Sequence, residues 1–371
     1  MPWDEASCTP LGSFWEGGAD CAAGEIVGDT QIVKDAGHPE ITLVAAGLQF
    51  PEGPVALADG SVLVVEIARG TLTRIASDGR RDIVAELGAG PNGAAIGQDG
   101  ACYICNNGGF TWSRDADQPR LVDLRPPVDQ GGGRIERVEL ETGRVERLYE
   151  ACDGRRLAAP NDLVFDAHGG FYFTDSGKHD EFRRDRGFLY YAKADGSQIQ
   201  ELTRELITPN GVALSPDERT VYVSETVTGR LWALEITAPG KIRAAGGLAE
   251  PIGRLVVGLP GYQLFDSMAV DSAGYICVAT VGNGGISRCA PDGGSYEHIP
   301  LPDPITTNIC FGGHDLRTAW ITLSQSGRLV SMQWPVPGLK LNNQTVPSST
   351  GAGPPERREF DRIGGLSADP A

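Results

Sequence analysis

Residues 160–176 read PNDLVFDAHGGFYFTDS, which is a polar residue after proline, a short apolar run, a turn and a second run of β-forming residues. Five further segments repeat this order: 51–66 (PEGPVALADGSVLVVE), 91–107 (PNGAAIGQDGACYICNN), 209–225 (PNGVALSPDERTVYVSE), 265–280 (FDSMAVDSAGYICVAT) and 307–322 (TNICFGGHDLRTAWIT). The DG, HGG, SPDE, SAG and GGHD sequences between the two runs favour tight hairpins. Each unit is therefore predicted to begin with an antiparallel hairpin.

The spacing of the units predicts the architecture. A third β-rich run follows each hairpin, and often a fourth, so each unit is expected to hold four antiparallel strands. The leading polar residues of successive units lie 40, 69, 49, 56 and 42 residues apart. Four-stranded repeats of about 40–50 residues are typical of propeller blades. The sequence thus predicts an all-β fold, a six-bladed β-propeller, and disfavours a parallel βαβ sheet because no long helical periodicity separates the runs.

The two ends of the chain are expected to meet in one blade. Unit six has only three clear strands, so EITLVAAGLQ, from Glu40, is predicted to be the outer strand of blade six and to close the ring. The propeller is then expected over 40–341, after an irregular extension at 1–39. The long second spacing implies an insertion at about 108–133 in blade two, and the Ser-, Thr-, Gly- and Pro-rich residues 342–371 are predicted to form a disordered tail.

Charge and hydropathy exclude several classes of partner. The 32 basic and 49 acidic side chains give a net charge of −17, whereas nucleic-acid binding requires clustered Lys and Arg. No apolar run approaches the roughly 20 residues that span a bilayer, and the N-terminus MPWDEASC lacks the features of a signal peptide. We expect a soluble, cytoplasmic protein without a membrane or nucleic-acid partner; its oligomeric state stays open.

The eight cysteines are expected to be mostly core thiols. Without a secretory signal, a disulfide framework is not expected in a chain of this size. Cys102 and Cys105 form a C-x-x-C, but they lie in a strand-like run in which residues three apart point to opposite faces. No second such pair or nearby His completes a zinc site. The sequence does not decide whether Cys8 and Cys21 pair.

The leading polar residue of each unit carries the functional signal. Each immediately precedes the strand nearest the propeller axis, so the approximate symmetry brings all six to one end of the central channel: Glu52, Asn92, Asn161, Asn210, Asp266 and Asn308. Two carboxylates and four amides suit a hard cation, above all Ca²⁺, with Mg²⁺ or Mn²⁺ possible and Zn²⁺ less suited. The alternative is that these residues only form the turns before each strand. Six positions in register, one of them a Glu, favour the metal site.

Several of these motifs resemble the regucalcin/gluconolactonase (SMP-30-like) family of calcium-dependent lactonases. The resemblance covers roughly Ile41 to Leu341 and is carried by PEGP at 51–54, PNDLVFDAHGGFYFTDS, TPNGVALSPDERTVYVSET at 208–226 and TNICFGGHDLRTAWIT. It implies a six-bladed propeller with a divalent cation in its channel. By motif, the implied metal ligands are Glu52, Asn161, Asn210 and Asp266. Phe265 and Ser267 depart from the Pro and Gly that usually flank the last of these, which changes the neighbours of the ligand but not the ligand.

The resemblance also implies an activity, the opening of a lactone ring by metal-activated water. Asp266 is then both a ligand and the general base, and the substrate is expected to contact Asn92, Asn308, Asn107, Trp112, His179 and Tyr262. The alternative for His179 is a solvated loop residue, and for Trp112 it is ordinary packing. Two other functions remain open at this point. They are hydrolysis of phosphotriesters or organophosphates on the same metal site, and a non-catalytic Ca²⁺-binding propeller.

Overall fold

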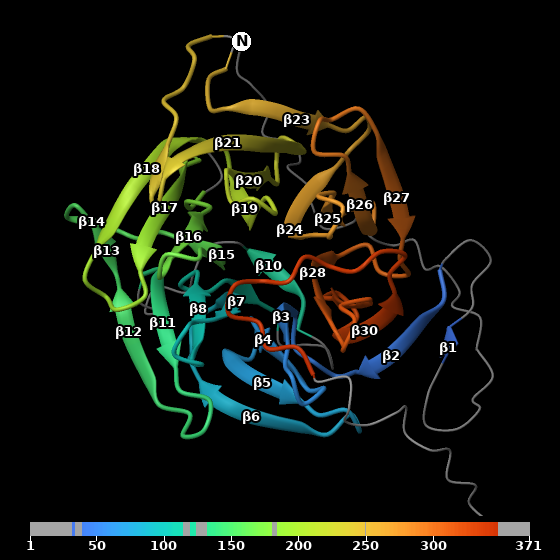
Figure 1. The fold of residues 1–371 in the computed structure, drawn as a ribbon. Helices are drawn as coiled ribbons and strands as arrows, with labels where there is room; N and C mark the ends of the chain where they lie inside the picture. Colours follow the sequence, from blue (N-terminus) through green and yellow to red (C-terminus); the bar gives the residue numbers. More distant parts are fainter. Residues whose placement is uncertain are drawn as a thin grey trace, which may run out of the picture.

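The computed structural model describes residues 32–33, 39–113, 119–123, 132–179, 184–248 and 250–347. This part of the chain consists of β-strands, turns and loops, and none of its elements is a helix that could span a membrane. Figure 1 shows six antiparallel blades arranged around a central axis. The predicted β-propeller is therefore confirmed.

The first three blades each contain four strands, ordered from the axis outward. Blade one comprises β3 (Pro51–Ala56), β4 (Val62–Glu66), β5 (Thr71–Ile75) and β6 (Arg81–Glu86). Blade two comprises β7 (Pro91–Ile96), β8 (Cys102–Asn106), β11 (Arg134–Val138) and β12 (Val145–Tyr149). Blade three comprises β15 (Pro160–Phe165), β16 (Gly170–Asp175), β17 (Gly187–Lys193) and β18 (Ile199–Leu206).

The other three blades follow the same plan. Blade four comprises β19 (Pro209–Leu214), β20 (Thr220–Glu225), β21 (Arg230–Ala238) and β23 (Arg254–Gly258). Blade five comprises β24 (Leu264–Val270), β25 (Ile276–Val281), β26 (Gly285–Cys289) and β27 (Tyr296–Pro300). Blade six comprises β28 (Thr306–Gly312), β29 (Thr318–Leu323), β30 (Arg328–Gln333) and β2 (Ile41–Ala45), with β1 (Ile32–Val33) paired outside β2.

The early strand β2 occupies the position predicted for it in blade six. It pairs antiparallel with β30, with Leu43 opposite Val330, so strands from the two ends of the propeller sequence share one sheet. The antiparallel ladder supplies hydrogen bonds that an open ring would leave unmade at that edge.

Three short hairpins account for the unequal spacing of the units. Within the predicted blade-two insertion, β9 (Thr111–Trp112) pairs with β10 (Leu121–Asp123), and residues 114–118 and 124–131 lie outside the described part. The sequence analysis did not foresee the hairpin of β13 (Ala151–Cys152) and β14 (Arg155–Arg156), or β22 (Lys241–Ile242), which extends β21 in blade four.

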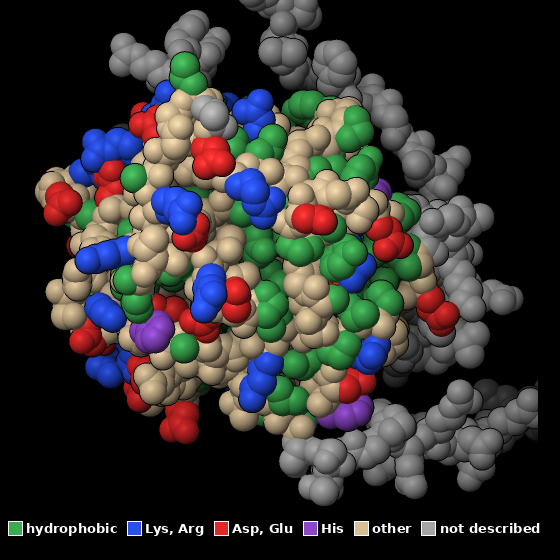
Figure 2. All heavy atoms as spheres, turned by 45° about the horizontal axis from the view of Figure 1, so that its top comes forward, with side chains coloured by type: hydrophobic (Ala, Val, Ile, Leu, Met, Phe, Trp, Pro, Cys, Tyr) green, Lys and Arg blue, Asp and Glu red, His purple; other side chains and the backbone are tan. Residues whose placement is uncertain are grey.

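The hydrophobic core lies between neighbouring blades. Cys102 packs with blade-one residues such as Leu63, whereas Cys105 packs with Ile135 and the blade-three residue Phe173. Both cysteines are fully buried free thiols on opposite faces of β8, so their predicted role as core thiols is confirmed. On the face seen in Figure 2, basic and acidic side chains are interspersed and form no single basic patch.

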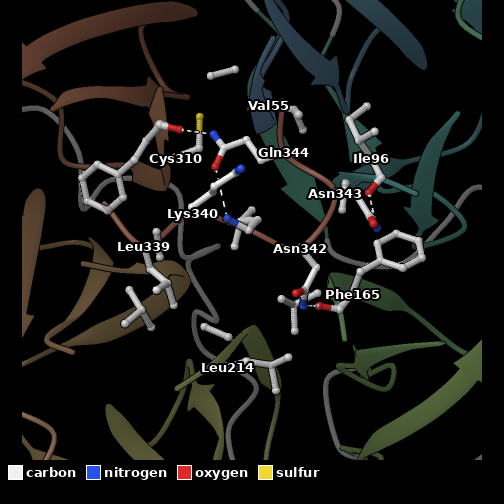
Figure 3. A pocket seen from close by; sticks show the side chains of 18 of the residues that line it. Val55, Ile96, Phe165, Leu214, Cys310, Leu339, Lys340, Asn342, Asn343 and Gln344 are labelled. Atoms are coloured by element: carbon white, nitrogen blue, oxygen red, sulfur yellow. Dashed lines mark hydrogen bonds between the residues drawn. The ribbon is translucent and has the colours of Figure 1, made fainter. Parts of the chain in front are cut away.

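After β30, the chain turns back across one end of the central channel. The Nδ2 atoms of Asn342 and Asn343 donate to the carbonyl oxygens of Phe165 (3.0 Å) and Ile96 (3.1 Å), and Gln344 Nε2 donates to that of Phe311 (2.7 Å) (Figure 3). These carbonyls belong to inner strands of three different blades. We call residues 339–344 the strap. Residues 342–344, assigned above to a disordered tail, are thus part of the fold; 348–371 lie outside the described residues.

Candidate metal centre and active site

The six leading polar residues all lie at the start of an inner strand. Consecutive inner strands contact one another around the whole ring, from β3 through β7, β15, β19, β24 and β28 back to β3. Because all six run in the same direction along the axis, their first residues gather at one end of the channel. The strap crosses the other end. We call the end that holds the leading residues the mouth.

A β-bulge lies at or next to the leading residue in every inner strand. In blade three, for example, Pro160 pairs with Asp175, and the next regular pair is Leu163 with Phe173. The inner strands of blades two, four and five shift register across the leading residue in the same way, and that of blade one shifts just after Glu52. In blade six the shift lies just before Asn308, between Thr306 and Asn308. A bulge interrupts the ladder and redirects a side chain. The repeated bulge therefore lets the leading side chains leave the sheet and face the axis.

Small residues beside the leading positions allow the inner strands to approach closely. A Cβ atom on Gly93 would lie 2.5 Å from the Asn161 carbonyl oxygen, and one on Gly53 would lie 2.6 Å from that of Asn92. The same atom on Gly211 would lie 2.8 Å from the Asp266 carbonyl oxygen. The backbones that carry the donors are thus packed directly against each other.

Glu52 is buried and only half satisfied. Its Oε2 atom accepts a hydrogen bond from Asn308 Nδ2 at 2.7 Å, which joins blades one and six, but its Oε1 atom has no partner among the described residues. Burial raises the pKa of Glu52 to about 7, against the opposing effect of the hydrogen bonds from Asn308 and Gly53. In the described part of the chain, the buried Oδ1 atom of Asn161 has no partner either.

Asp266 and Asn210 lie at the junction of blades four and five. Ser267 Oγ donates to Asn210 Oδ1 at 3.3 Å, and Asn210 Nδ2 donates to Thr226 Oγ1 at 3.1 Å. Burial, and then the negative charge of Glu52, raise the pKa of Asp266 well above its usual value. The carboxyl groups of Glu52 and Asp266 are therefore close enough for electrostatic repulsion between them.

Asp162 is a third buried carboxyl that the sequence analysis missed. It accepts hydrogen bonds from the backbone N–H groups of Val212 (3.2 Å) and Leu163 (2.9 Å), and so ties the inner strands of blades three and four together. Burial and the charge of Glu52 raise the pKa of Asp162 to about 8. The signal was its place directly after Asn161 in the PND motif, at the bulge.

These residues fit a hard cation. Two buried oxygen atoms lack a partner among the described residues, and the charge of Glu52 raises the pKa of both Asp162 and Asp266. A positive charge among these groups would pair with the two oxygens and lower both pKa values. In the described part of the chain, no group of three or more His, Cys, Asp or Glu side chains forms a metal cluster. The donor ring is instead rich in amides, and carboxylate and amide oxygens are ligands of Ca²⁺.

The remaining predicted site residues fall into two groups. Asn92 and Asn308 are buried in the ring of leading residues. Asn107 is buried in the loop that follows β8, and Trp112, in β9, packs against Phe50 with ring centroids 5.1 Å apart. His179 forms a β-bridge with Arg184 in the loop after β16, and Tyr262 is 77% exposed between β23 and β24.

A cavity of about 340 Å³ fills the channel between the ring and the strap (Figure 3). Its walls are mostly apolar inner-strand residues such as Val55, Ile96 and Leu214, and only Asp162 and Asn308 reach it from the ring. It lies on the side of the ring away from the mouth. A polar substrate would therefore approach the donors from the mouth.

Fold and donors together define a six-bladed β-propeller with a ring of oxygen donors at one end of its channel. A family model described as the SMP-30/gluconolactonase/LRE-like region matches residues 50–325, and the chain belongs to this family. The resemblance expected from the sequence motifs is thereby confirmed.

Relatives and solved structures agree with this membership. Lactonase drp35 of Staphylococcus haemolyticus is 28% identical over 271 residues, which cover 72% of this chain and 74% of that protein. A 6-deoxy-6-sulfogluconolactonase of Pseudomonas putida is 30% identical over 196 residues, covering 52% and 64%. A gluconolactonase structure from Xanthomonas campestris has a TM-score of 0.63 at 22% identity, covering 82% of this chain and 95% of that chain. A calcium-binding regucalcin structure from Agrobacterium tumefaciens has a TM-score of 0.58 at 19% identity, covering 79% and 95%.

Proposed function

We propose that this protein hydrolyses lactones with the help of one divalent cation, in the first place Ca²⁺, held by Glu52, Asn161, Asn210 and Asp266. Membership of the family supports the reaction, since relatives of this chain are named lactonase and sulfogluconolactonase. The donor chemistry supports the cation. The substrate is a small-molecule lactone that enters from the mouth.

The observation that carries the proposal is the pair of unpartnered buried oxygens, Glu52 Oε1 and Asn161 Oδ1. An unsatisfied buried acceptor costs about 1–3 kcal/mol, and more when it is charged. Two such atoms in one ring are costly to a fold unless a ligand compensates them. A protein whose ring only shaped turns would have no need of them.

The chain's own residues then have distinct roles. When bound, the cation supplies Lewis acidity that polarises the lactone carbonyl. Asp266 accepts the proton of the attacking water as the new C–O bond forms, and returns a proton to the ring oxygen as the ring C–O bond breaks. Asn308 holds the Glu52 carboxylate in place through its 2.7 Å hydrogen bond. The product is the open-chain hydroxy acid.

The test is a pH-stat assay over a lactone panel with metal-loaded and chelator-treated protein. We expect hydrolysis that disappears with chelation and returns with Ca²⁺. Full activity after chelation would overturn the metal dependence. Turnover of phosphotriesters alone would replace the lactone by a phosphoryl substrate. Calcium-dependent thermal stabilisation without any turnover would reduce the protein to a binding propeller.

Two variants separate the roles of the carboxyls. Asp266→Asn keeps an oxygen donor but loses the base, so we expect turnover to fall by about 10²-fold or more. Glu52→Gln removes one charge from the ring, so weaker calcium binding should precede the loss of rate, and higher Ca²⁺ should restore part of it. Calcium titration by calorimetry and rates at saturating Ca²⁺ measure the two effects. Full activity of Asp266→Asn would exclude Asp266 as the base.

The expected cytoplasmic location stays a prediction, which cell fractionation checks.

A further inference from the structure

Two loops border the mouth beside blades two and three. Asn107 follows Asn106, which pairs with Pro91, so it lies next to the ring residue Asn92. Lys178 follows Asp175, which pairs with Pro160, so its loop borders the ring residue Asn161. Both loops therefore flank the donor ring, and both carry polar groups that the mechanism above does not use.

Lys178 is a half-buried ammonium group with unused donors. Its Nζ atom donates to the backbone carbonyl oxygen of Asn107 at 2.6 Å and lies 5.6 Å from the ring centroid of Phe110. None of the ion pairs between described residues includes Lys178. The nearby carboxylate of Asp175 is already occupied by the N–H groups of Ala158, Ala159 and Gly177. An ammonium group has three donors.

Asn107 adds a second unused donor. Its side chain is 1% exposed, and its Oδ1 atom accepts the Gly109 N–H at 2.7 Å. Its Nδ2 atom is buried and has no partner within the part of the chain that the structure describes. The 2.6 Å hydrogen bond joins the Lys178 ammonium group to the backbone carbonyl of Asn107, so this group lies against the residue that carries the buried amide, at the edge of the donor ring.

Aromatic rings border the same two residues. Trp112 packs against both Phe50 and Phe110, with centroids 5.1 Å and 6.1 Å away, and all three rings are half-buried. They form a wall from blade one to the Lys178 loop. Such a wall suits the carbon skeleton of a ligand, while the adjacent donors suit an anionic group attached to it.

We infer that Lys178 and Asn107 form an anion-recognition subsite, so that the preferred lactone carries a sulfonate or carboxylate on its ring substituent. This inference rests on the proposed lactonase function and deepens it. The ammonium and the amide both donate to the anion, and the aromatic wall covers the apolar atoms beside it. Lys178 is then a specificity-determining residue, distinct from the metal ligands.

The test compares two substrates that differ in one charge. One is a butyrolactone that carries a charged sulfomethyl substituent (–CH2–SO3⁻), and the other is the corresponding neutral sulfonamide. A sulfonate is chosen because carboxylate oxygens are themselves ligands of Ca²⁺. For Lys178→Met at pH 7, we expect KM for the sulfonate to rise about 10-fold to 100-fold, as for loss of a charge-assisted hydrogen bond, and KM for the sulfonamide to stay within about twofold.

Two further variants make the comparison specific. Lys178→Arg keeps the positive charge and should keep part of the preference. Lys193→Met is the matched control, because Lys193 lies 5.5 Å from the Tyr191 ring centroid and donates to the His168 carbonyl at the end of the molecule away from the mouth. It should behave as the unmodified protein. Circular dichroism confirms that each variant is folded.

Each outcome decides the question. The subsite is overturned if Lys178→Met has the same ratio of the two KM values as the unmodified protein. Lower thermal stability of that variant would then show that Lys178 only balances the charge of Asp175. If neither lactone is hydrolysed, the proposed function fails for these substrates. In that case ligand-observed NMR with tetrahydrofuran-2-methanesulfonate still tests the subsite, which is overturned if Lys178→Met binds this probe as the unmodified protein does.

Discussion

Buried polar atoms without partners mark the candidate site at the scale of single residues. Glu52 Oε1, Asn161 Oδ1 and Asn107 Nδ2 are three of the seven buried side-chain atoms without a hydrogen bond among the described residues, and each lies at or beside the mouth. Three of the other four belong to tryptophan rings. An isolated Trp N–H costs little beside an unpaired carboxylate oxygen. The acceptors therefore indicate a cation, and the amide donor indicates an anion.

The charge of Lys178 predicts a pH dependence of substrate recognition. Burial lowers the pKa of Lys178 to about 8, against the opposing charge of Asp175. The groups that face it from blade two, the Asn107 carbonyl and the Phe110 ring, do not titrate, and Asp185 accepts its backbone N–H. The ammonium is thus charged below this pKa and neutral above it. KM for the sulfonate lactone should be lowest at neutral pH and rise as the pH passes through 8.

Lys178→Arg serves as the control for this profile, since a guanidinium stays protonated throughout this range. Its KM for the sulfonate should remain flat up to about pH 9. Initial rates corrected for spontaneous lactone hydrolysis give both profiles. If KM for the sulfonate rises with pH in the same way in the unmodified protein and in Lys178→Arg, another group causes the pH effect.

Among the elements, the inner strand is the unit that builds the site. Each one carries a donor near its start and a bulge at or next to it, and lies against the next inner strand. At Gly53, Gly93 and Gly211 the two backbones come into direct contact. The bulge directs the donor side chain toward the axis. A glycine next to the donor, as at Gly53, Gly93 and Gly211, lets the next strand approach. The same short motif therefore specifies both the direction of the ligand and the diameter of the ring.

Gly93→Ala tests this arrangement. Its new Cβ atom would lie 2.5 Å from the Asn161 carbonyl oxygen and 2.6 Å from the Asp162 Cα atom, so blades two and three must separate. Overpacking of this kind costs about 1–3 kcal/mol in the free energy of unfolding. We also expect weaker calcium binding, because Asn161 shifts with its backbone. Urea unfolding and calcium titration measure the two effects.

Gly132→Ala is the matched control. A Cβ atom there meets nothing nearer than the Leu157 carbonyl oxygen at 3.5 Å, and its φ is not positive. Its effect should stay below about 0.5 kcal/mol, as for a surface substitution. If Gly93→Ala loses no more unfolding free energy than Gly132→Ala, the inner strands tolerate a methyl group. The close approach of their backbones then does not determine the diameter of the ring.

Two segments close the molecule as a whole. The β2 strand pairs with β30 at the outer edge, and the strap crosses the channel near the axis. The strap and the residues before it contact five blades: Leu339 N–H donates to Val270 O of blade five, and Asn342 also donates to Glu218 of blade four. The carbonyls of blades two, three and six complete the set. The strap therefore links the blades across the axis.

Truncation separates the strap from the residues beyond it. Removal of 337–371 should lower the melting temperature by several degrees, since it removes several hydrogen bonds of about 1 kcal/mol each. It should also expose Cys310, a thiol that lines the cavity beneath the strap, to alkylation. Removal of 348–371 alone should leave both properties unchanged. Thermal unfolding and peptide mapping after iodoacetamide treatment provide the readings.

A replacement of the three amides by alanine, at 342, 343 and 344, refines the same test. It keeps the chain length and removes only the side-chain hydrogen bonds. Faster Cys310 alkylation in this variant would show that these three side-chain hydrogen bonds keep the channel closed. Wild-type stability and alkylation in both the long truncation and the triple variant would show that the strap does not close the channel.

The sequence by itself determined the repeat, the six blades and the leading polar residues, because alternating apolar runs and hairpin turns are local signals that recur once in each blade. It also placed β2 in blade six, since an incomplete unit at one end and an extra strand at the other can only pair with each other. The family follows from the same short motifs.

Only the tertiary structure decided which polar groups meet. Asp162 joins the ring, the strap reaches back to inner strands more than 150 residues earlier in the chain, and Lys178 contacts Asn107 across 71 residues. Tyr262, by contrast, remains exposed to solvent. Such contacts depend on how blades close around an axis, on bulges and on backbone approach, and none of these leaves a local pattern in the order of the amino acids.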